Sequence, residues 1–230
     1  MPPFLTAEWR SLLLLNYEVA PRLLQPFVPA GTELDRHDDK CYASVVAFRF
    51  LNTRVLGIPI LFHRHFTELN LRFYVRRAGR RGVVFIREVV PRMAIALTAR
   101  LMYNEPYTTL PMRSSVNGAV RHEWRLGGQW HHVSAAPSGT AVVPVPGSHE
   151  EFITDHEWGY TRQRDGGTIE YQVRHDRWPV QRALDLDLDA DFPALYGSTL
   201  GSALRSPATA FLVAGSPVTV GRPVRLARDV

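Results

Sequence analysis

The sequence has 230 residues, of which 45% are hydrophobic and 10% aromatic, so it can build a folded core and is not an intrinsically disordered chain. The formal net charge is +5, but the arginines are scattered and Lys40 is the one lysine among 27 basic residues, which argues against a nucleic-acid partner. The single cysteine, Cys41, excludes an intramolecular disulfide, and the leucine run at 12–15 is too short to cross a membrane. We therefore expect a cytoplasmic protein that forms a single domain over residues 1–230, with neither nucleic acid nor a membrane as partner.

Turn signals recur at short intervals, and most segments between them alternate apolar and polar residues, which predicts a β-rich protein with a few helices. Strands are predicted, in chain order, at residues 42–50, 65–77, 82–90, 120–126, 129–134, 168–175 and 183–189, with two more between 208 and 226. Helices are predicted at residues 20–27, 93–103, 149–154 and 193–204. The third helix begins with a capping box formed by Ser148 and Glu151, and the second and third strands pair across an arginine-rich turn at 76–81.

The strand at residues 65–77, HFTELNLRFYVRR, has two unlike faces. Its odd-numbered residues are mainly apolar and are expected to face the core. The even-numbered face carries four polar side chains, which are Glu68, Asn70, Arg72 and Tyr74. Alternation alone slightly favours a solvent-exposed ridge, because antiparallel sheets commonly have one wet face, but it leaves the lumen of a closed barrel open as the alternative.

Histidines next to this strand raise the alternative of a metal site. His63, His65 and Glu68 approach the metal motif of cupins, in which an H-x-H pair and a later glutamate share one wall of a barrel. Here the glutamate follows His65 by three residues, so the two side chains point to opposite faces of a strand unless a bulge intervenes. Neither a G-x-S-x-G nucleophile elbow nor a glycine-rich phosphate loop occurs in the sequence. We therefore expect no metal and no cofactor, with a metal-dependent cupin-like enzyme as the weaker alternative.

Several segments of the chain carry a resemblance to a known family: NYEVAPRLLQPFVPAGTELD, YASVVAFRF, FTELNLRFYV, GVVFI, ARLMYNEPY and DHEWGYT…YQVRHDRWPV. In that order they resemble the uncharacterised YqjF-like family, a domain of unknown function in the acetoacetate-decarboxylase-like superfamily. The resemblance extends from about Trp9 to Val224. It implies an α+β fold, mainly an antiparallel β barrel or cone with a few flanking helices, around a small-molecule cavity with Glu68 on its inner wall. The superfamily also suggests a homo-oligomer.

The decarboxylase of that superfamily carries a G-R-E-x-x-G-x-P-K-K motif, whose first lysine forms a Schiff base with a keto acid. The corresponding stretch here is ARLMYNEPYT, in which Arg100 and Pro106 keep the arginine and the proline. Tyr107 stands where the reactive lysine would be, and a phenol cannot form an imine. The one lysine, Lys40, lies beside two aspartates that should keep it protonated. The resemblance therefore implies a related cavity with different chemistry.

We expect a protein that binds a small organic acid or carbonyl compound, or an acid/base enzyme that resembles acetoacetate decarboxylase without its Schiff base. The candidate catalytic residues are Glu68 and Tyr107. The candidate substrate-binding residues are Asn70, Arg72, Tyr74 and Arg100. The alternative from a different class is a ligand-binding or sensor module that performs no catalysis.

Overall fold

The computed structural model describes residues 3–60, 64–92, 104 and 106–227. The strands are β1 (Leu5–Glu18), β2 (Glu33–Leu34), β3 (Tyr42–Val55), β4 (Ile58–Pro59), β5 (Phe66–Arg77), β6 (Arg80–Val90), β7 (Tyr107–Thr109), β8 (Met112–Asn117), β9 (Ala119–Leu126), β10 (Gln129–Val142), β11 (Trp158–Arg162), β12 (Thr168–His175), β13 (Val180–Asp189), β14 (Thr209–Val213), β15 (Pro217–Val220) and β16 (Val224–Arg225). The helical segments are α1 (Pro21–Leu24), the 3₁₀ turn η1 (Gln25–Phe27), α3 (His149–Thr154), α4 (Phe192–Tyr196) and α5 (Ser198–Gly201).

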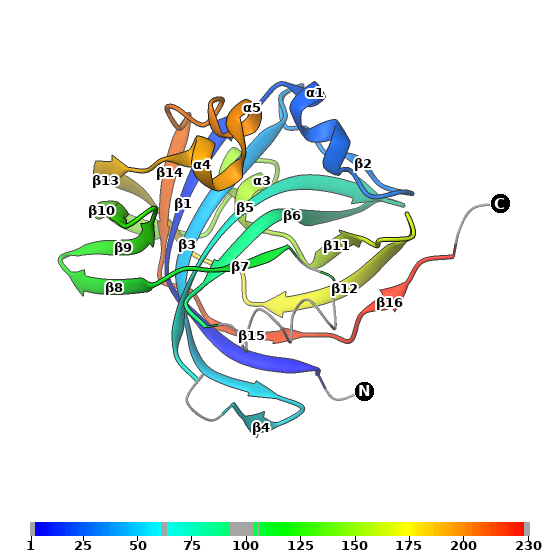
Figure 1. The fold of residues 1–230 in the computed structure, drawn as a ribbon, viewed down its shortest axis with the longest axis horizontal. Helices are drawn as coiled ribbons and strands as arrows, with labels where there is room; N and C mark the ends of the chain where they lie inside the picture. Colours follow the sequence, from blue (N-terminus) through cyan, green and yellow to red (C-terminus); the bar gives the residue numbers. More distant parts are fainter. Residues whose placement is uncertain (1–2, 61–63, 93–103, 105, 228–230) are drawn as a thin grey trace.

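Strands far apart in the sequence close into a barrel, in the order β3, β5, β6, β11, β12, β15 and β1 (Figure 1). The barrel closes because β1 pairs back onto β3 from Leu5 to Glu18. Neighbouring barrel strands are antiparallel except for β6 and β11, which are parallel. Closure makes successive side chains of each strand alternate between the lumen and the outside. The expected barrel-type fold is confirmed.

A second sheet grows from the same strand β1. The first part of β1, Leu5–Glu8, pairs with β15 in the barrel, whereas the second part, Leu12–Asn16, pairs with β14. Beyond β14 this sheet continues through β13, β10 and β9 to β8, on the left side of Figure 1. The two parts of β1 are separated by a break in register near Ser11, whose φ of 55° marks a bulge. The bulge allows β1 to pair with β15 in the barrel along its first part and with β14 in the second sheet along its second part.

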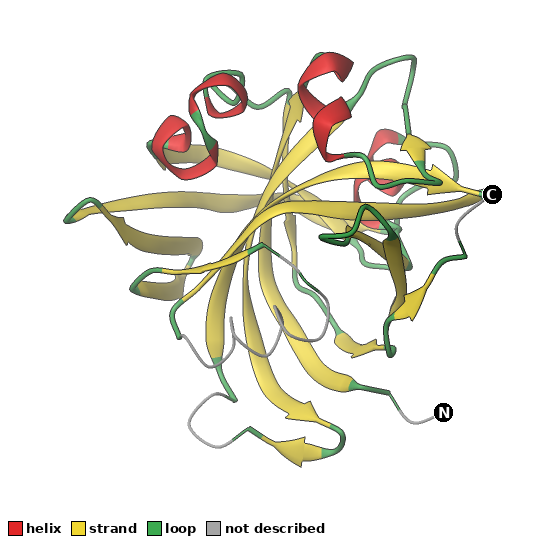
Figure 2. Cartoon of the chain, turned by 45° about the vertical axis from the view of Figure 1, so that its right-hand side comes forward, coloured by secondary structure: helices red, strands yellow, loops and turns green. Residues whose placement is uncertain are grey.

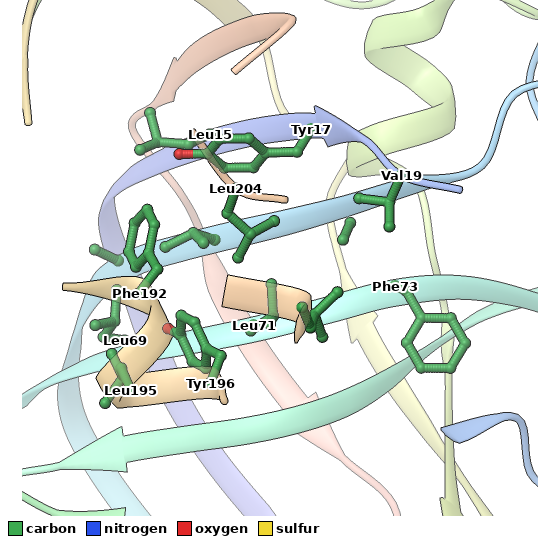
Figure 3. Packing of buried hydrophobic residues seen from close by; sticks show 14 of the residues in the cluster. Leu15, Tyr17, Val19, Leu69, Leu71, Phe73, Phe192, Leu195, Tyr196 and Leu204 are labelled. Atoms are coloured by element: carbon green, nitrogen blue, oxygen red, sulfur yellow. The ribbon is translucent and has the colours of Figure 1, made fainter. Parts of the chain in front are cut away.

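The helices gather at one end of the long strands, as Figure 1 and Figure 2 both show. Helices α4 and α5 cover the outer side of the sheet, where Phe192, Leu195 and Tyr196 of α4 share a buried cluster with Leu69 and Leu71 of β5 (Figure 3). Burial of a large apolar side chain of this kind contributes on the order of 1.5–3 kcal/mol. The odd-numbered residues of β5 therefore face a core, and this prediction is confirmed.

Some predicted helices and strands differ from the observed ones. The helix predicted at 193–204 is two short helices, because Gly197 between them has a φ of 89°, outside the helical region. Three short strands, instead of two, occupy 208–226. The helix predicted at 93–103 lies outside the described residues. Across the described ranges, no helix is long and apolar enough to span a membrane.

Helix α3 begins as predicted and reaches the candidate site. The Ser148 hydroxyl accepts a hydrogen bond from the backbone N–H of Glu151 at 3.2 Å. The Glu151 carboxylate accepts in turn from the N–H of Gly147 at 2.6 Å, one residue further back than in the usual capping box. At the other end of the helix, the carbonyl oxygen of Ile153 accepts a hydrogen bond from Arg72 at 3.0 Å.

Both faces of β5 are buried. Every residue from Phe66 to Val75 is buried, including Glu68 at 2% and Arg72 at 9% exposure. The solvent-exposed ridge that alternation alone slightly favoured is therefore wrong, because the barrel wraps this face into its lumen. Charged side chains are seldom buried without a specific role, which makes this face the candidate site.

Candidate functional site

The barrel encloses a cavity of about 180 Å³, and most of its wall is apolar. Aromatic rings form a large share of this wall; besides Tyr107, they belong to Phe4, Trp9, Phe48, Phe50, Phe66, Phe85 and Tyr171. Polar side chains gather on the side built by β5, β6 and β7, and β3 adds one more; they are Glu68, Asn70, Arg72, Glu88, Tyr107 and Thr53. A largely apolar pocket with a few convergent polar groups is the usual form of a small-molecule site.

Glu68 is central to the polar wall, and burial controls its chemistry. Its Oε1 accepts a hydrogen bond from Asn70 Nδ2 at 3.0 Å, and its Oε2 accepts one from the Tyr107 hydroxyl at 3.4 Å. Burial raises the pKa of Glu68 to about 7, while both hydrogen bonds oppose the rise because they stabilise the carboxylate. Near neutral pH both protonation states are populated, which suits a group that moves protons in either direction.

A bulge in β6 brings a second carboxyl group into the cavity. The register between β5 and β6 slips by one residue at Ile86. Phe85 faces the cavity before the slip, and after it the alternation is inverted, so that Glu88 faces the cavity as well. Glu88 is 3% exposed and lies between Asn70 of β5 and Tyr107 of β7 in the pairing of the three strands. The polar wall therefore holds two carboxyl groups.

Arg72 lines the same wall toward helix α3. Its Nη2 donates to the Ile153 carbonyl, and its Nε has no hydrogen-bond partner within the described part of the chain. A guanidinium held in this way is suited to binding a carboxylate. Tyr74 is not among the described residues that line the cavity. Its hydroxyl lies 2.5 Å from Ser44 Oγ and 3.5 Å from the Ile153 carbonyl oxygen, so it supports the group that holds Arg72 instead of facing a ligand.

Tyr107 enters the cavity from β7, a short strand parallel to β6. The Pro106 carbonyl accepts a hydrogen bond from the N–H of Glu88 at 3.2 Å, which fixes the start of β7. Asn104, at the glycine position of the decarboxylase motif, has a φ of 56°, a conformation that glycine and asparagine adopt most readily. The local geometry thus fits the proposed correspondence with that motif, and it brings a phenol, where the motif has a lysine, against Glu68.

The one lysine of the chain is not among the residues that line the cavity. Its ammonium lies 2.8 Å from the Glu18 carboxylate, and both side chains are half exposed. The hydrogen bond to Glu18 raises the pKa of Lys40, so that the amine is firmly protonated. The direction is as predicted, but the main partner is Glu18, and Asp38 contributes less to the raised pKa.

The remaining predicted ligands do not converge on this cavity. Arg100 and His63 lie outside the described residues. His65 lies on a different pocket from Glu68, and its Nδ1 accepts a hydrogen bond from the N–H of Asn52 at 3.3 Å. In the part of the chain that the structure describes, no group of three or more His, Cys, Asp or Glu residues could hold a metal ion.

Sequence analysis missed Glu88, Thr53 and the aromatic part of the wall. Glu88 follows a bulge, and alternation read from a sequence cannot reveal where a strand will insert an extra residue. The one available signal was an acidic residue between Arg87 and the two valines that end the predicted strand at 82–90. Thr53 lies in β3 beyond the predicted end of the strand at residue 50.

A closed, mainly antiparallel barrel around a largely apolar cavity with one polar side defines a protein of the acetoacetate-decarboxylase-like fold. Acetoacetate decarboxylase from Legionella pneumophila has a TM-score of 0.70 at 14% identity, covering 98% of this chain and 88% of its own. The enduracididine biosynthesis enzyme MppR complexed with pyruvate has a TM-score of 0.69 at 13% identity, covering 99% and 92%. An acetoacetate decarboxylase-like enzyme from Sphingomonas wittichii RW1 has a TM-score of 0.66 at 13% identity, covering 98% and 94%. At these identities the similarity establishes the fold.

The chain belongs to the DUF2071 family of uncharacterized conserved proteins, whose family model matches residues 6–217. It is also similar to the uncharacterized protein YqjF of Bacillus subtilis (strain 168), with 27% identity over 180 residues that cover 76% of this chain and 74% of YqjF. The family resemblance seen in the sequence segments is confirmed.

Proposed function

We propose that this protein binds a small organic acid or carbonyl compound in the barrel cavity. The observation that carries the proposal is the burial of Glu68 and Arg72 on one wall of a largely apolar cavity. Removing two charged groups from water costs several kcal/mol unless partners compensate. A ligand carboxylate would complete the hydrogen bonding of Arg72, and a ligand hydroxyl or N–H would satisfy the buried Oδ1 of Asn70, which lacks a partner within the described residues.

The distribution of side chains favours a ligand with a polar head and an apolar body. Along β5 the polar side chains follow one another from Glu68 toward helix α3, where Arg72 lies. At the opposite end of the same wall the rings of Phe50 and Phe66 stack with their centroids 4.5 Å apart. The acid group would bind Arg72 and the apolar body would lie along the rings. The comparisons support this class, since MppR was solved with pyruvate and the decarboxylase is named for acetoacetate, and both compounds are small keto acids.

The polar wall is suited to acid/base chemistry. In the ionised form Glu68 would take a proton from a carbon next to the ligand carbonyl, and in the protonated form it would return one. Tyr107 and Asn70 would orient the carboxyl through the hydrogen bonds that they already make. Ligand binding at Arg72 adds negative charge near Glu68, so binding near pH 7 should be accompanied by proton uptake. No imine enters this scheme, because a phenol takes the position of the lysine.

Ligand binding can be tested by measuring how much each of a panel of small keto and hydroxy acids raises the Tm of the protein. At least one acid should stabilise the wild-type protein, and Arg72→Ala should weaken its binding about 10- to 150-fold, since a hydrogen bond to a charged group is worth 1.5–3 kcal/mol. The matched control is Arg76→Ala, because Arg76 lies on the same strand but pairs with Glu33 at the surface. An unchanged response in Arg72→Ala, or an equal loss in both variants, would refute the binding role.

Catalysis and simple binding are separated by a second measurement on the same acids. In heavy water, NMR should show exchange of the hydrogen next to the ligand carbonyl with the wild-type protein and not with Glu68→Gln. Binding without exchange would identify the protein as a non-catalytic ligand-binding or sensor module.

A further inference from the structure

A second pocket, which we call the outer pocket, has a volume of about 270 Å³ and lies outside the barrel lumen. The polar residues that line it are Arg49, His65, Thr67, Arg92 and Ser114. Arg49 and Thr67 lie opposite each other in the pairing of β3 and β5, on the face away from Glu68. Within the described residues, no acidic side chain lines the outer pocket.

Arg49 is a partly buried cation without an acidic partner. In the described part of the chain neither a hydrogen bond nor an ion pair engages its guanidinium, whereas Arg10, opposite it on β1, pairs with Glu8 at 2.7 Å. Like charges directly opposite on neighbouring strands are destabilising, and here only Arg10 is neutralised. The charge of Arg49 also lowers the pKa of the buried His122, although burial is the main cause. An uncompensated guanidinium of this kind is suited to binding an anion.

A hydrogen-bonded chain holds a hydroxyl group beside Arg49. Burial lowers the pKa of His122 to about 4, so the ring is neutral at physiological pH. Its Nε2 must donate to the Ser11 carbonyl oxygen at 2.9 Å, because a carbonyl only accepts, and its Nδ1 therefore accepts from the Ser114 hydroxyl at 2.7 Å. With that proton used, Ser114 accepts from Thr67 at 2.7 Å. Thr67 thus donates its own proton to Ser114, and its oxygen can accept a hydrogen bond from a ligand.

We propose that the outer pocket binds the phosphate group of a small phosphorylated compound. Arg49 and Arg92 supply two guanidiniums, which match the charge of about −1.5 to −2 on a phosphate monoester near pH 7 better than the single charge of a carboxylate. His65 adds an Nε2–H donor, since its Nδ1 already accepts from a backbone N–H. Phe66 lines both this pocket and the barrel cavity, so the phosphate would bind next to the first site.

Titration of the full-length protein with inorganic phosphate at constant ionic strength tests the proposal. Acetate and chloride, titrated in the same way, serve as the monovalent control anions. Phosphate should raise the Tm more than either monovalent anion. Arg49→Gln should weaken phosphate binding about ten- to hundred-fold in isothermal titration calorimetry, because it removes a charged donor. Arg54→Gln should not, since Arg54 is an exposed arginine on the same strand that does not line the pocket. Arg72→Gln should also leave phosphate affinity unchanged, which separates the outer pocket from the barrel cavity.

The stability of the variants without phosphate separates a binding role from a structural one. Arg49→Gln should have a Tm equal to or above that of the wild type, because it removes a like-charge contact. If this variant does not fold, Arg92→Gln, at an exposed position, provides the same test and should weaken phosphate binding about tenfold. Unchanged phosphate affinity in both Arg49→Gln and Arg92→Gln, equal stabilisation by chloride and phosphate, or an equal loss in Arg54→Gln would overturn the proposal.

Discussion

Glu68→Gln should remove a pH dependence that the wild-type carboxyl imposes on stability. In the folded protein burial raises the pKa of Glu68 to about 7, whereas in the unfolded chain the pKa of a glutamate is about 4.3. Between these two pH values the folded state holds a proton that the unfolded state has released. The contribution of Glu68 to stability is therefore greatest in acid, is lost as the pH rises toward 7, and stays low above it.

The magnitude follows from the two pKa values. A difference of one pKa unit between the folded and unfolded states corresponds to about 1.4 kcal/mol. Between pH 5 and pH 8 the raised pKa of Glu68 should therefore lower the free energy of unfolding by about 2–3 kcal/mol. Glutamine has nearly the shape of the protonated carboxyl and does not ionise. The stability of Glu68→Gln relative to the wild type should therefore grow by about 2–3 kcal/mol from pH 5 to pH 8, or roughly 5–10 °C in Tm for a chain of this size.

Urea unfolding of both proteins at pH 5, 6, 7 and 8 measures this difference directly. Groups that titrate equally in both proteins, such as the buried His122 and His156, cancel when the two free energies of unfolding are subtracted. Glu33→Gln, at an exposed position, serves as the control for replacing a surface glutamate. A pH-independent difference for Glu68→Gln would refute the conclusion that this carboxyl is buried with a raised pKa.

Three further outcomes follow from the same structure. Tyr107→Phe removes a hydrogen bond that stabilises the Glu68 carboxylate, so the pKa of Glu68 should rise above about 7 and the loss of stability should move to higher pH in the same urea series. Borohydride reduction in the presence of pyruvate or acetoacetate should leave the protein mass unchanged, and a covalent adduct at Lys40 would contradict the absence of an imine. Gly82→Ala would place a Cβ atom 2.6 Å from the ring of Tyr160 and 2.7 Å from a backbone carbonyl oxygen, so urea unfolding should show a loss of about 1–3 kcal/mol; an unchanged stability would mean that the strands β6 and β11 can separate there.

The amino-acid sequence predicted most elements of the fold because local rules place them. Alternation located β5, β6 and β12, and the capping box located the start of α3. The prediction of a single helix at 193–204 was wrong because helix propensity does not show that Gly197 adopts a positive φ, which ends the first helix. The family resemblance, carried by motifs such as the run from Phe66 to Val75, supplied the barrel that alternation alone could not.

By itself the sequence determined which side chains of β5 share a face, since the two-residue period of a strand is a property of the local backbone. It could not determine what that face meets, because this depends on the pairing of β1 with β3, two strands that a helix and a long loop separate in the chain. That closure turns Glu68 inward and removes it from water, and the bulge at Ile86 places Glu88 opposite Asn70 on the wall of the same cavity. The protonation of the site is therefore a product of tertiary structure, because desolvation is decided by everything that packs around a carboxyl group and not by its neighbours in sequence.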